Sequence, residues 1–152
     1  MSRGRRVLDL GSGAGYFPLI CRTEGHRPLA LDLDDEPLYR ELIEFFGLPR
    51  LVHRIAPLQS LPDDLGEFDV VTAFRICFDT NGDGSQWGAD EWAFLLQDLR
   101  TRLTPGGRVV LGFNVNRQTG TFYSPATAAL LKQLPGYRTR LFFEYALLTR
   151  TA

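Results

Sequence analysis

Residues 7–17 read Val-Leu-Asp-Leu-Gly-Ser-Gly-Ala-Gly-Tyr-Phe, an apolar run followed by three alternating glycines. The apolar part, which begins at Arg6, predicts a short buried strand over residues 6–10. Glycines after a strand let the backbone turn tightly and let a ligand approach the N-terminus of the next helix. We therefore expect a strand, a ligand-binding loop, and a helix over residues 16–24 that ends at Gly25.

The remaining sequence alternates between strand and helix patterns. Short apolar runs predict strands at residues 28–33, 51–55, 68–74 and 108–113. Start and stop signals predict helices over residues 37–46, 89–103 and 125–134, with Pro105-Gly106-Gly107 separating the second of these from the strand after it. This alternation predicts an α/β fold: a doubly wound, Rossmann-like, mostly parallel sheet with helices on both faces.

The last segment, residues 137–149, is strand-like in composition. It contains no Gly or Pro that would mark a hairpin. The sequence leaves two alternatives here, one long strand or two strands joined by almost no turn.

The composition is typical of a single globular domain over residues 1–152, with 44% hydrophobic and 23% charged residues. The formal net charge of −1 gives no general attraction to nucleic acid or to anionic membranes. We therefore expect no membrane partner and disfavour nucleic acid, although a small local basic patch is compatible with this net charge. No apolar run approaches the roughly 18 residues of a membrane helix. The basic N-terminus continues into Asp9 and Gly11, unlike a signal peptide. We expect a cytoplasmic protein in which Cys21 and Cys77 are reduced, packed thiols.

Ligands of an open parallel sheet bind at the carboxyl ends of its strands. Gly11 follows the first predicted strand, and Asp32 lies near the end of the second, where a carboxylate can accept hydrogen bonds from a ribose diol. The pattern predicts a nucleoside-containing ligand. The alternative is that the glycines only form a turn and that Asp32 caps the next helix.

Two cofactor classes fit such a site. The dinucleotide fingerprint requires a small residue where Tyr16 stands, because a bulky side chain there obstructs close packing of helix and strand. The carboxylate of Asp9, two residues before Gly11, would repel a pyrophosphate and attract an amine and a sulfonium. These residues favour S-adenosylmethionine over a nicotinamide cofactor.

Four segments in order resemble one family: VLDLGSGAGYF (7–17), ALDLD (30–34), LPDDLGEFDVVTAF (61–74) and LTPGGRVVLGFN (103–114). From about Arg5 to Asn114 the chain is similar to class I S-adenosylmethionine-dependent methyltransferases. The resemblance implies a seven-stranded sheet whose last strand is antiparallel. It also implies a cofactor site of Asp9, Gly11, Ser12, Gly13, Gly15 and Tyr16 at the methionine part, Asp32 at the ribose, Leu33 at the adenine, and Phe74 and Arg75 near the reacting methyl.

The chain departs from this family at two places. Pro57 stands where many members carry an acid that contacts the adenine amine, so we expect backbone contacts from Leu58 and Gln59 instead. The first strand begins within a few residues of Met1, whereas many members carry helices before it. We therefore expect a domain without an N-terminal cap, either a minimal enzyme or a trimmed chain whose site a protein partner or an oligomer covers.

Methyl transfer from a sulfonium requires mainly that the acceptor be held in line with the methyl. No residue is therefore required as a catalyst, and we name none. The substrate candidates on loops after the strands are Arg75, Asp79 and Asn114. We expect a small-molecule acceptor. The alternatives are a non-catalytic subunit of this fold that binds a protein partner and, less favoured, a nicotinamide-dependent oxidoreductase.

Residues 79–90 carry a second pattern, D-x-N-x-D-G with an acid at the twelfth place, which is typical of a calcium loop. Asp90 replaces the longer Glu of that motif, and a strand precedes the loop where the motif has a helix. We favour a flexible loop over the active site and expect no metal. We also expect structural roles for His26 and His53.

Overall fold

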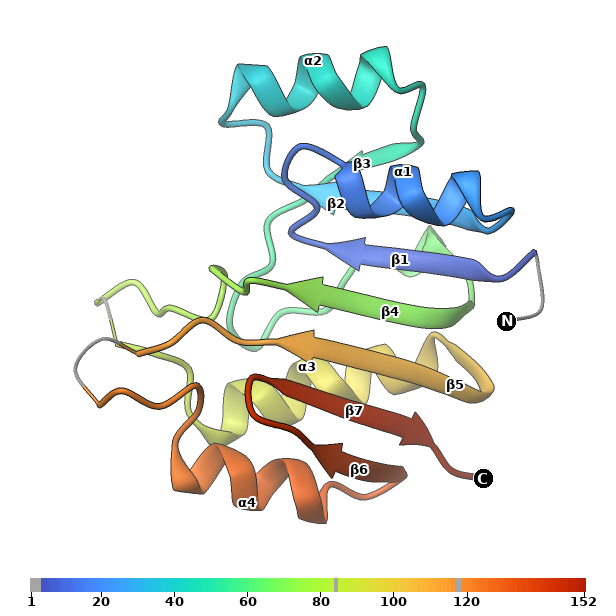
Figure 1. Cartoon of the computed structure of the whole chain (residues 1–152). Coiled ribbons are helices and arrows are strands. Elements are labelled where there is room, and N and C mark those ends of the chain that lie inside the picture. The colour runs from blue at the N-terminus through green and yellow to red at the C-terminus, as the bar shows by residue number, and fades with distance from the viewer. Residues whose placement is uncertain (1–3, 84, 117–118) are drawn as a thin grey trace.

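In the computed structural model, residues 4–83, 85–116 and 119–152 are described. Within them the strands form one 7-stranded sheet with the order β3-β2-β1-β4-β5-β7-β6 (Figure 1). The strands are β1 (Arg6–Leu10), β2 (Arg27–Asp32), β3 (Arg50–Val52), β4 (Phe68–Phe74), β5 (Leu103–Gly112), β6 (Tyr137–Leu141) and β7 (Tyr145–Arg150). The strand order reverses between β1 and β4, which are parallel neighbours. The predicted doubly wound, mostly parallel sheet is confirmed.

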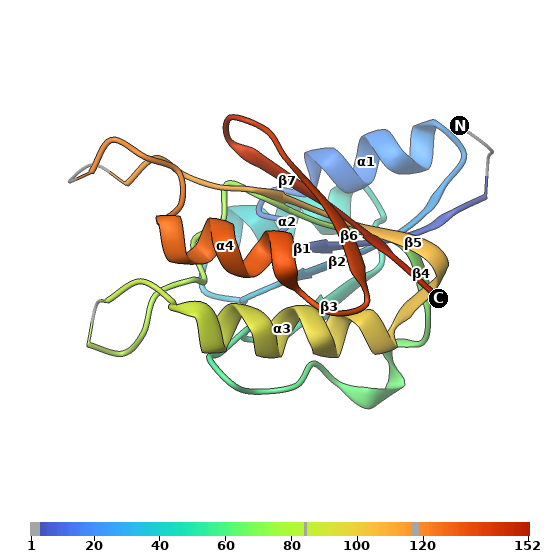
Figure 2. The ribbon, with the colours of Figure 1, turned by 90° about the horizontal axis from the view of Figure 1, so that it is seen from below.

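The helices cover the sheet in two layers. They are α1 (Tyr16–Thr23), α2 (Pro37–Phe45), α3 (Ala89–Thr101) and α4 (Pro125–Gln133), with a 3-10 turn at Asp63–Leu65. α1 and α2 lie on one face and α3 and α4 on the other (Figure 2). No helix in the described ranges is long and apolar enough to cross a membrane.

The main core lies between the sheet and α3. Trp92, Leu96 and Leu99 of α3 are buried in one cluster with Val109 and Leu111 of β5. Fully burying one such side chain stabilises the fold by about 1.5–3 kcal/mol. These α3 residues recur at helical spacing, so they form one face of the helix and pack against β5.

The start signals of two helices act as predicted. Pro37 and Pro125 occupy the first turns of α2 and α4, and Ser124 caps α4 by accepting a hydrogen bond from the Thr127 N–H at 3.0 Å. The cap of α2 is Glu36, whose side chain accepts from the Leu38 N–H at 3.4 Å. The alternative that Asp32 only caps the next helix is therefore wrong.

The boundary between α3 and β5 differs from the prediction. α3 ends at Thr101, and Leu103 already pairs with Phe68 in the sheet. Pro105-Gly106-Gly107 therefore lies inside β5, where the register against β4 shifts between Phe68 and Val70. A bulge at the start of a strand tolerates proline and glycine, which explains why these residues did not separate the two elements.

The C-terminal segment forms two strands. β6 and β7 pair antiparallel, joined through residues 142–144, and the Phe142 N–H donates to the Tyr145 carbonyl at 2.8 Å. In the described ranges Leu58 and Arg75 are the only residues other than glycine with positive φ, so this turn needs no left-handed residue. That is why a hairpin forms here without Gly or Pro. β7 also runs antiparallel to β5, as the family resemblance implied.

Candidate functional site

The glycine loop leaves β1 and crosses the end of β2. The Gly11 and Ser12 N–H groups both donate to the Leu31 carbonyl, at 2.8 and 3.2 Å. Gly11, Gly13 and Gly15 have φ values of 68°, 52° and 77°. Side chains other than glycine rarely adopt this region. Glycine at these alternating positions therefore lets the loop follow this path without backbone strain.

The glycines serve two different purposes. A Cβ atom on Gly15 would lie 2.8 Å from Ile43 Cγ1, so Gly15 lets α1 begin against α2. A Cβ on Gly11 or Gly13 would meet its nearest neighbour, Phe78 or Tyr39, at 3.9 and 3.7 Å. The backbone at Gly11 and Gly13 therefore borders open space, which a ligand can fill.

Asp32 ties this loop to the end of β2. One carboxylate oxygen accepts from the Gly13 N–H at 2.5 Å and the other accepts from the Leu33 N–H at 2.7 Å. A carboxylate offers about four acceptor positions. Two of these remain for hydroxyl donors of a ligand, so Asp32 can fix the loop and bind a diol at the same time.

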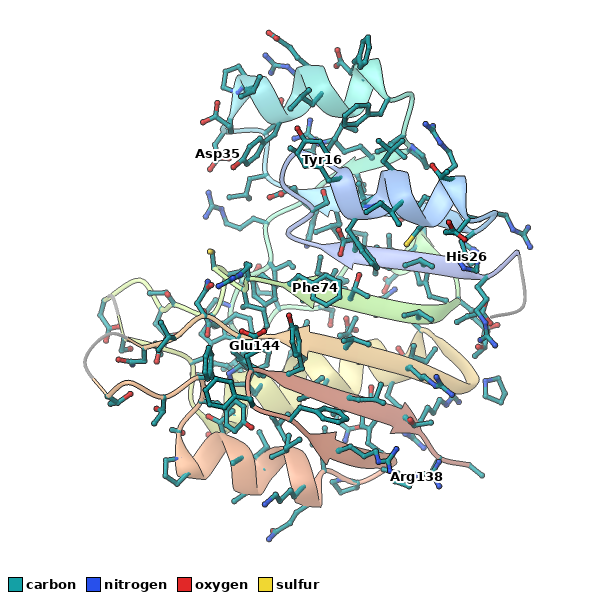
Figure 3. All side chains as sticks on the ribbon, in the orientation of Figure 1. Tyr16, His26, Asp35, Phe74, Arg138 and Glu144 are labelled. Atoms are coloured by element: carbon teal, nitrogen blue, oxygen red, sulfur yellow. The ribbon has the colours of Figure 1, made fainter. Side chains whose placement is uncertain are left out.

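A cavity of about 760 Å³ opens at the carboxyl ends of β1, β2 and β4, within the usual size range of ligand pockets. Its wall includes Gly11, Gly13, Asp32, Leu33, Phe74 and Arg75 of the predicted cofactor residues. Among the described residues, Asp9, Ser12, Gly15, Tyr16, Leu58 and Gln59 do not line it. Asp35 points out from this end of the sheet, whereas His26 lies at the opposite end (Figure 3).

The part of the cavity next to β3 has a mixed wall. It consists of His53, Arg54, Ile55, Ala56 and Pro57. Leu33 and Tyr39 also line the cavity. Ile55, Ala56 and Pro57 offer apolar contact to a flat ring. His53, which we expected to be structural, lies in this wall and is half-buried.

Asp9 lies beneath the loop and is buried. Its carboxyl accepts a hydrogen bond from Thr72 Oγ1 of β4 at 2.6 Å. Burial raises the pKa of Asp9 to about 7, the Thr72 hydrogen bond opposes this rise, and the charge of Asp32 adds to it. Near neutral pH Asp9 is therefore partly protonated, and its repulsion of an anionic ligand is weaker than the sequence suggested.

Tyr16 does not obstruct the packing of α1. Its side chain is 60% exposed, and its ring lies 5.8 Å from the ring of Phe46. Gly15 occupies the close contact with Ile43 instead. The bulk of Tyr16 is therefore no argument against a nicotinamide cofactor, and that part of the prediction is wrong.

Arg75 has a strained backbone at the end of β4. Its φ is 56°, which is uncommon for a side chain of this size. Arg75 and Phe74 line both the large cavity and a neighbouring hollow of about 90 Å³. The other residues of that hollow are Gly112, Phe113, Glu144 and Tyr145. Phe74 and Glu144 lie at this end of the sheet in Figure 3.

Gly112 makes the floor of this hollow. A Cβ there would lie 3.0 Å from Tyr145 and 3.1 Å from Phe74, whose ring centroids are 6.3 Å apart. Phe17 of α1 packs edge-on against Phe74 at 4.9 Å. Three elements that are distant in sequence therefore form one aromatic floor beside Arg75.

The other two substrate candidates do not line either cavity in the described residues. The Asn114 amide donates to the Ile76 carbonyl at 2.8 Å and so holds the segment after β4. Asp79 is half-buried, and burial raises its pKa. Cys77 is exposed, so the prediction of a packed thiol is wrong for Cys77. It is correct for Cys21, which is buried.

The calcium-like segment forms a small hairpin. Thr80 and Gln86 form an antiparallel bridge, and Asp83 accepts hydrogen bonds from the Ser85 N–H and hydroxyl at 2.9 and 2.6 Å. Gly84 of the motif lies outside the described residues. Within the described ranges no group of three His, Cys, Asp or Glu side chains could hold a metal ion.

Several wall residues escaped the sequence reasoning. Tyr39, Arg54, Phe78, Glu144 and Tyr145 line the two cavities without belonging to any quoted motif. Phe78 packs against Trp87 at 5.6 Å, and Trp87 is buried. Phe78 follows the fourth strand closely in sequence, and this position could have marked it as a site residue. Tyr145 reaches the site only because β7 pairs with β5.

Comparison with known proteins gives one curated relative and many similar structures. The chain is 30% identical over 113 residues to tRNA U34 carboxymethyltransferase of Syntrophotalea carbinolica, covering 72% of this chain and 32% of that protein. The chain thus spans about a third of the length of this relative. No family model matches the sequence.

Two solved structures illustrate the similarity of fold. A methyltransferase from Pyrococcus furiosus superposes with a TM-score of 0.70 at 17% identity, over 99% of this chain and 77% of that one. The 1,6-didemethyltoxoflavin-N1-methyltransferase of Burkholderia thailandensis, solved with its substrate and S-adenosylhomocysteine, gives 0.67 at 20% identity, over 99% and 72%.

Proposed function

We propose that this chain, which has the class I S-adenosylmethionine-dependent methyltransferase fold, binds S-adenosylmethionine and transfers its methyl group to an acceptor. The observation that carries this proposal is the cavity of about 760 Å³ whose wall contains Gly11, Gly13 and Asp32 at the point where strand order reverses. Ligands of doubly wound sheets bind at this point.

The residues present fit this cofactor. Gly11 and Gly13 leave room for a ligand against the backbone, and Asp32 retains acceptor positions for two ribose hydroxyls. The Ser12 hydroxyl is buried without a hydrogen-bond partner in the described structure, so a ligand atom can satisfy it. Leu33 with Ile55–Pro57 provides apolar contact for the adenine.

The remaining predicted cofactor residues take supporting roles in this proposal. Asp9 lies buried below the loop, where it accepts a hydrogen bond from Thr72, and Gly15 and Tyr16 set the start of α1. Leu58 and Gln59 come directly after Pro57 in the sequence. Pro57 lines the cavity on the adenine side, and Leu58 and Gln59 do not. None of these residues reacts.

When bound, S-adenosylmethionine supplies a methyl group on a sulfonium, which is itself the electrophile. Arg75 and Phe74 border both cavities, so an acceptor in the smaller hollow lies next to the large one. The Arg75 guanidinium can orient an anionic group of the acceptor. Asn114 holds the segment that follows Arg75, the Asp79 carbonyl accepts from the Trp87 N–H, and catalysis follows from positioning alone.

The acceptor class is open to two readings. The net charge of −1 favours a small molecule. The curated relative is named for a modification of tRNA, and the Burkholderia neighbour for methylation of a small heterocycle. Either acceptor can present one ring or functional group to the hollow beside Arg75.

Calorimetric titration with S-adenosylhomocysteine tests the proposal. We expect micromolar binding by the unmodified chain and a loss of about 1–3 kcal/mol in Asp32→Ala, the scale of hydrogen bonds to a charged group. Asp64→Ala, which removes an exposed acid far from the cavity, should bind normally. Thermal unfolding of both variants controls for the role of Asp32 in holding Gly13. Absence of binding by the unmodified chain, or saturable NADH binding instead, would refute the proposal.

A further inference from the structure

One face of the sheet is left open over β5, β7 and β6. α3 and α4 cover the opposite face, and α1 and α2 lie over the other half of the molecule (Figures 1 and 2). In the described part of the chain no helix covers this area. Mostly parallel sheets are usually covered on both faces. The side chains that this face presents therefore indicate what it meets.

Strand register places these side chains in three rows. The first row, at the carboxyl end, contains Phe74, Gly112 and Tyr145; the second contains Val110, Leu147 and Arg140; the third contains Arg108, Thr149 and Arg138. Successive rows lie about 7 Å apart, and neighbouring strands about 4.8 Å apart. Three exposed arginines therefore start within roughly 12 Å of one another on one surface.

The strands of this surface carry charge of one sign, and Glu144 lies in the turn before β7, beside Tyr145. β5, β6 and β7 contain four arginines and no acidic residue. Arg150 donates to the Leu103 carbonyl on the other side of the sheet. Within the described ranges Arg108, Arg138 and Arg140 make no ion pair, whereas Arg50 pairs with Asp34 at 3.0 Å. Like charges held this close repel one another, and an anionic partner relieves that repulsion.

We propose that this surface, the arginine face (Arg108, Arg138 and Arg140), binds the phosphates of a single-stranded nucleic acid. Guanidinium groups bind phosphate oxygens in a bidentate manner. A nucleic acid presents phosphates at a regular spacing, which suits cations repeated along β6 and present again on β5. An acidic protein surface offers no such regular repeat.

The position of the arginine face favours a single strand over a duplex. The row next to Arg140 contains Tyr145, which borders the hollow of about 90 Å³ with Phe74 and Arg75. A base can enter such a hollow only when it is not stacked in a duplex. Delivery of a base to this hollow rests on the proposed function. Binding of the phosphates does not.

The net charge of the whole chain does not indicate this surface, because it averages basic and acidic regions. Arg108 is separated from Arg138 by α4 and its loops, and only the pairing of β5 with β7 and of β7 with β6 brings them together. The expectation that nucleic acid is not a partner rested on the overall charge. The local charge on this face favours the opposite interpretation.

Fluorescence anisotropy with a labelled 12-nucleotide single-stranded RNA tests the proposal on the full chain. We expect binding at low salt with a log–log salt slope near −2, since each of three contacts contributes about −0.7 on single strands. Arg138→Gln should weaken binding at least threefold, while Lys132→Gln, which removes one exposed cation from α4 on the covered face, should not. The triple variant Arg108→Gln, Arg138→Gln, Arg140→Gln should abolish the salt dependence.

Three results would overturn the inference. The first is absence of RNA binding at about 50 mM salt, where phosphate contacts are strong. The second is that Lys132→Gln and Arg138→Gln weaken RNA binding equally. The third is displacement of the RNA by poly-L-glutamate at equal charge, which would show that the face binds acidic polypeptides. Circular dichroism verifies that each variant is folded. S-adenosylhomocysteine binding, measured separately, distinguishes failure of this inference from failure of the proposed function.

Discussion

Asp9→Asn should stabilise the protein relative to the unmodified chain, and this gain in unfolding free energy should be larger at alkaline than at acidic pH. Asp9 is buried, and its pKa is raised from 3.8 to about 7 in the folded state. A carboxyl whose pKa rises on folding destabilises the folded state once the unfolded chain has lost its proton. The penalty begins above about pH 4 and stops growing above about pH 7.

The size of this effect follows from linkage. Each unit of pKa difference corresponds to 1.36 kcal/mol, so the full penalty approaches about 4 kcal/mol above pH 7. More than half of it, roughly 2–3 kcal/mol, develops between pH 5 and pH 8. Asn keeps an oxygen that accepts from Thr72 and carries no charge, so the variant loses this pH dependence.

Urea unfolding of both proteins at pH 5 and pH 8 measures the effect. The difference in unfolding free energy between variant and unmodified chain should move by about 2–3 kcal/mol in favour of the variant as pH rises. Taking the difference cancels the other titrating groups. If it is the same at both pH values, Asp9 does not carry a raised pKa, and the inferred environment beneath the loop is wrong.

Two further results are expected. Gly15→Ala should destabilise the fold by about 2–5 kcal/mol, because it places an alanine in the left-handed region and its Cβ only 2.8 Å from Ile43. Gly13→Ala should cost only the backbone strain of a left-handed alanine, about 1–2 kcal/mol. Equal losses of stability in thermal unfolding would contradict the assigned packing. Cys77 should react with a thiol reagent and Cys21 should not, and saturating S-adenosylhomocysteine should slow the Cys77 reaction at least fivefold; a rate that the ligand leaves unchanged would place the ligand elsewhere.

Local signals predicted most of the fold. β1 and β4 have the predicted bounds because buried strands of a parallel sheet are continuous apolar runs with polar or glycine-rich ends. Errors arose where tertiary pairing overrides local preference. Leu103 continues the apolar stripe of α3 in sequence, but pairing with Phe68 draws it into β5.

The site was predicted in part for the same reason. Gly11, Gly13 and Asp32 belong to short motifs whose backbone requirements are readable from residue type. Tyr145 and Glu144 enter through the register of β7 on β5, which no short pattern encodes. The charge state of Asp9 depends on burial by neighbours on several elements, so no short sequence pattern predicts that its pKa is raised to about 7.

The position of β1 between β2 and β4 has a consequence for how the protein folds. Val7 pairs with Val70, so the glycine loop and Arg75 become neighbours only after a long crossover has closed. Parallel pairings of this kind form slowly because the loop entropy is lost before the contact is gained. A ligand held between the loop and the end of β4 binds only chains that have completed this pairing, and it stabilises them by RT ln(1 + [L]/Kd). Binding of a nucleoside ligand therefore reports the completion of this long-range pairing as well as the state of the site.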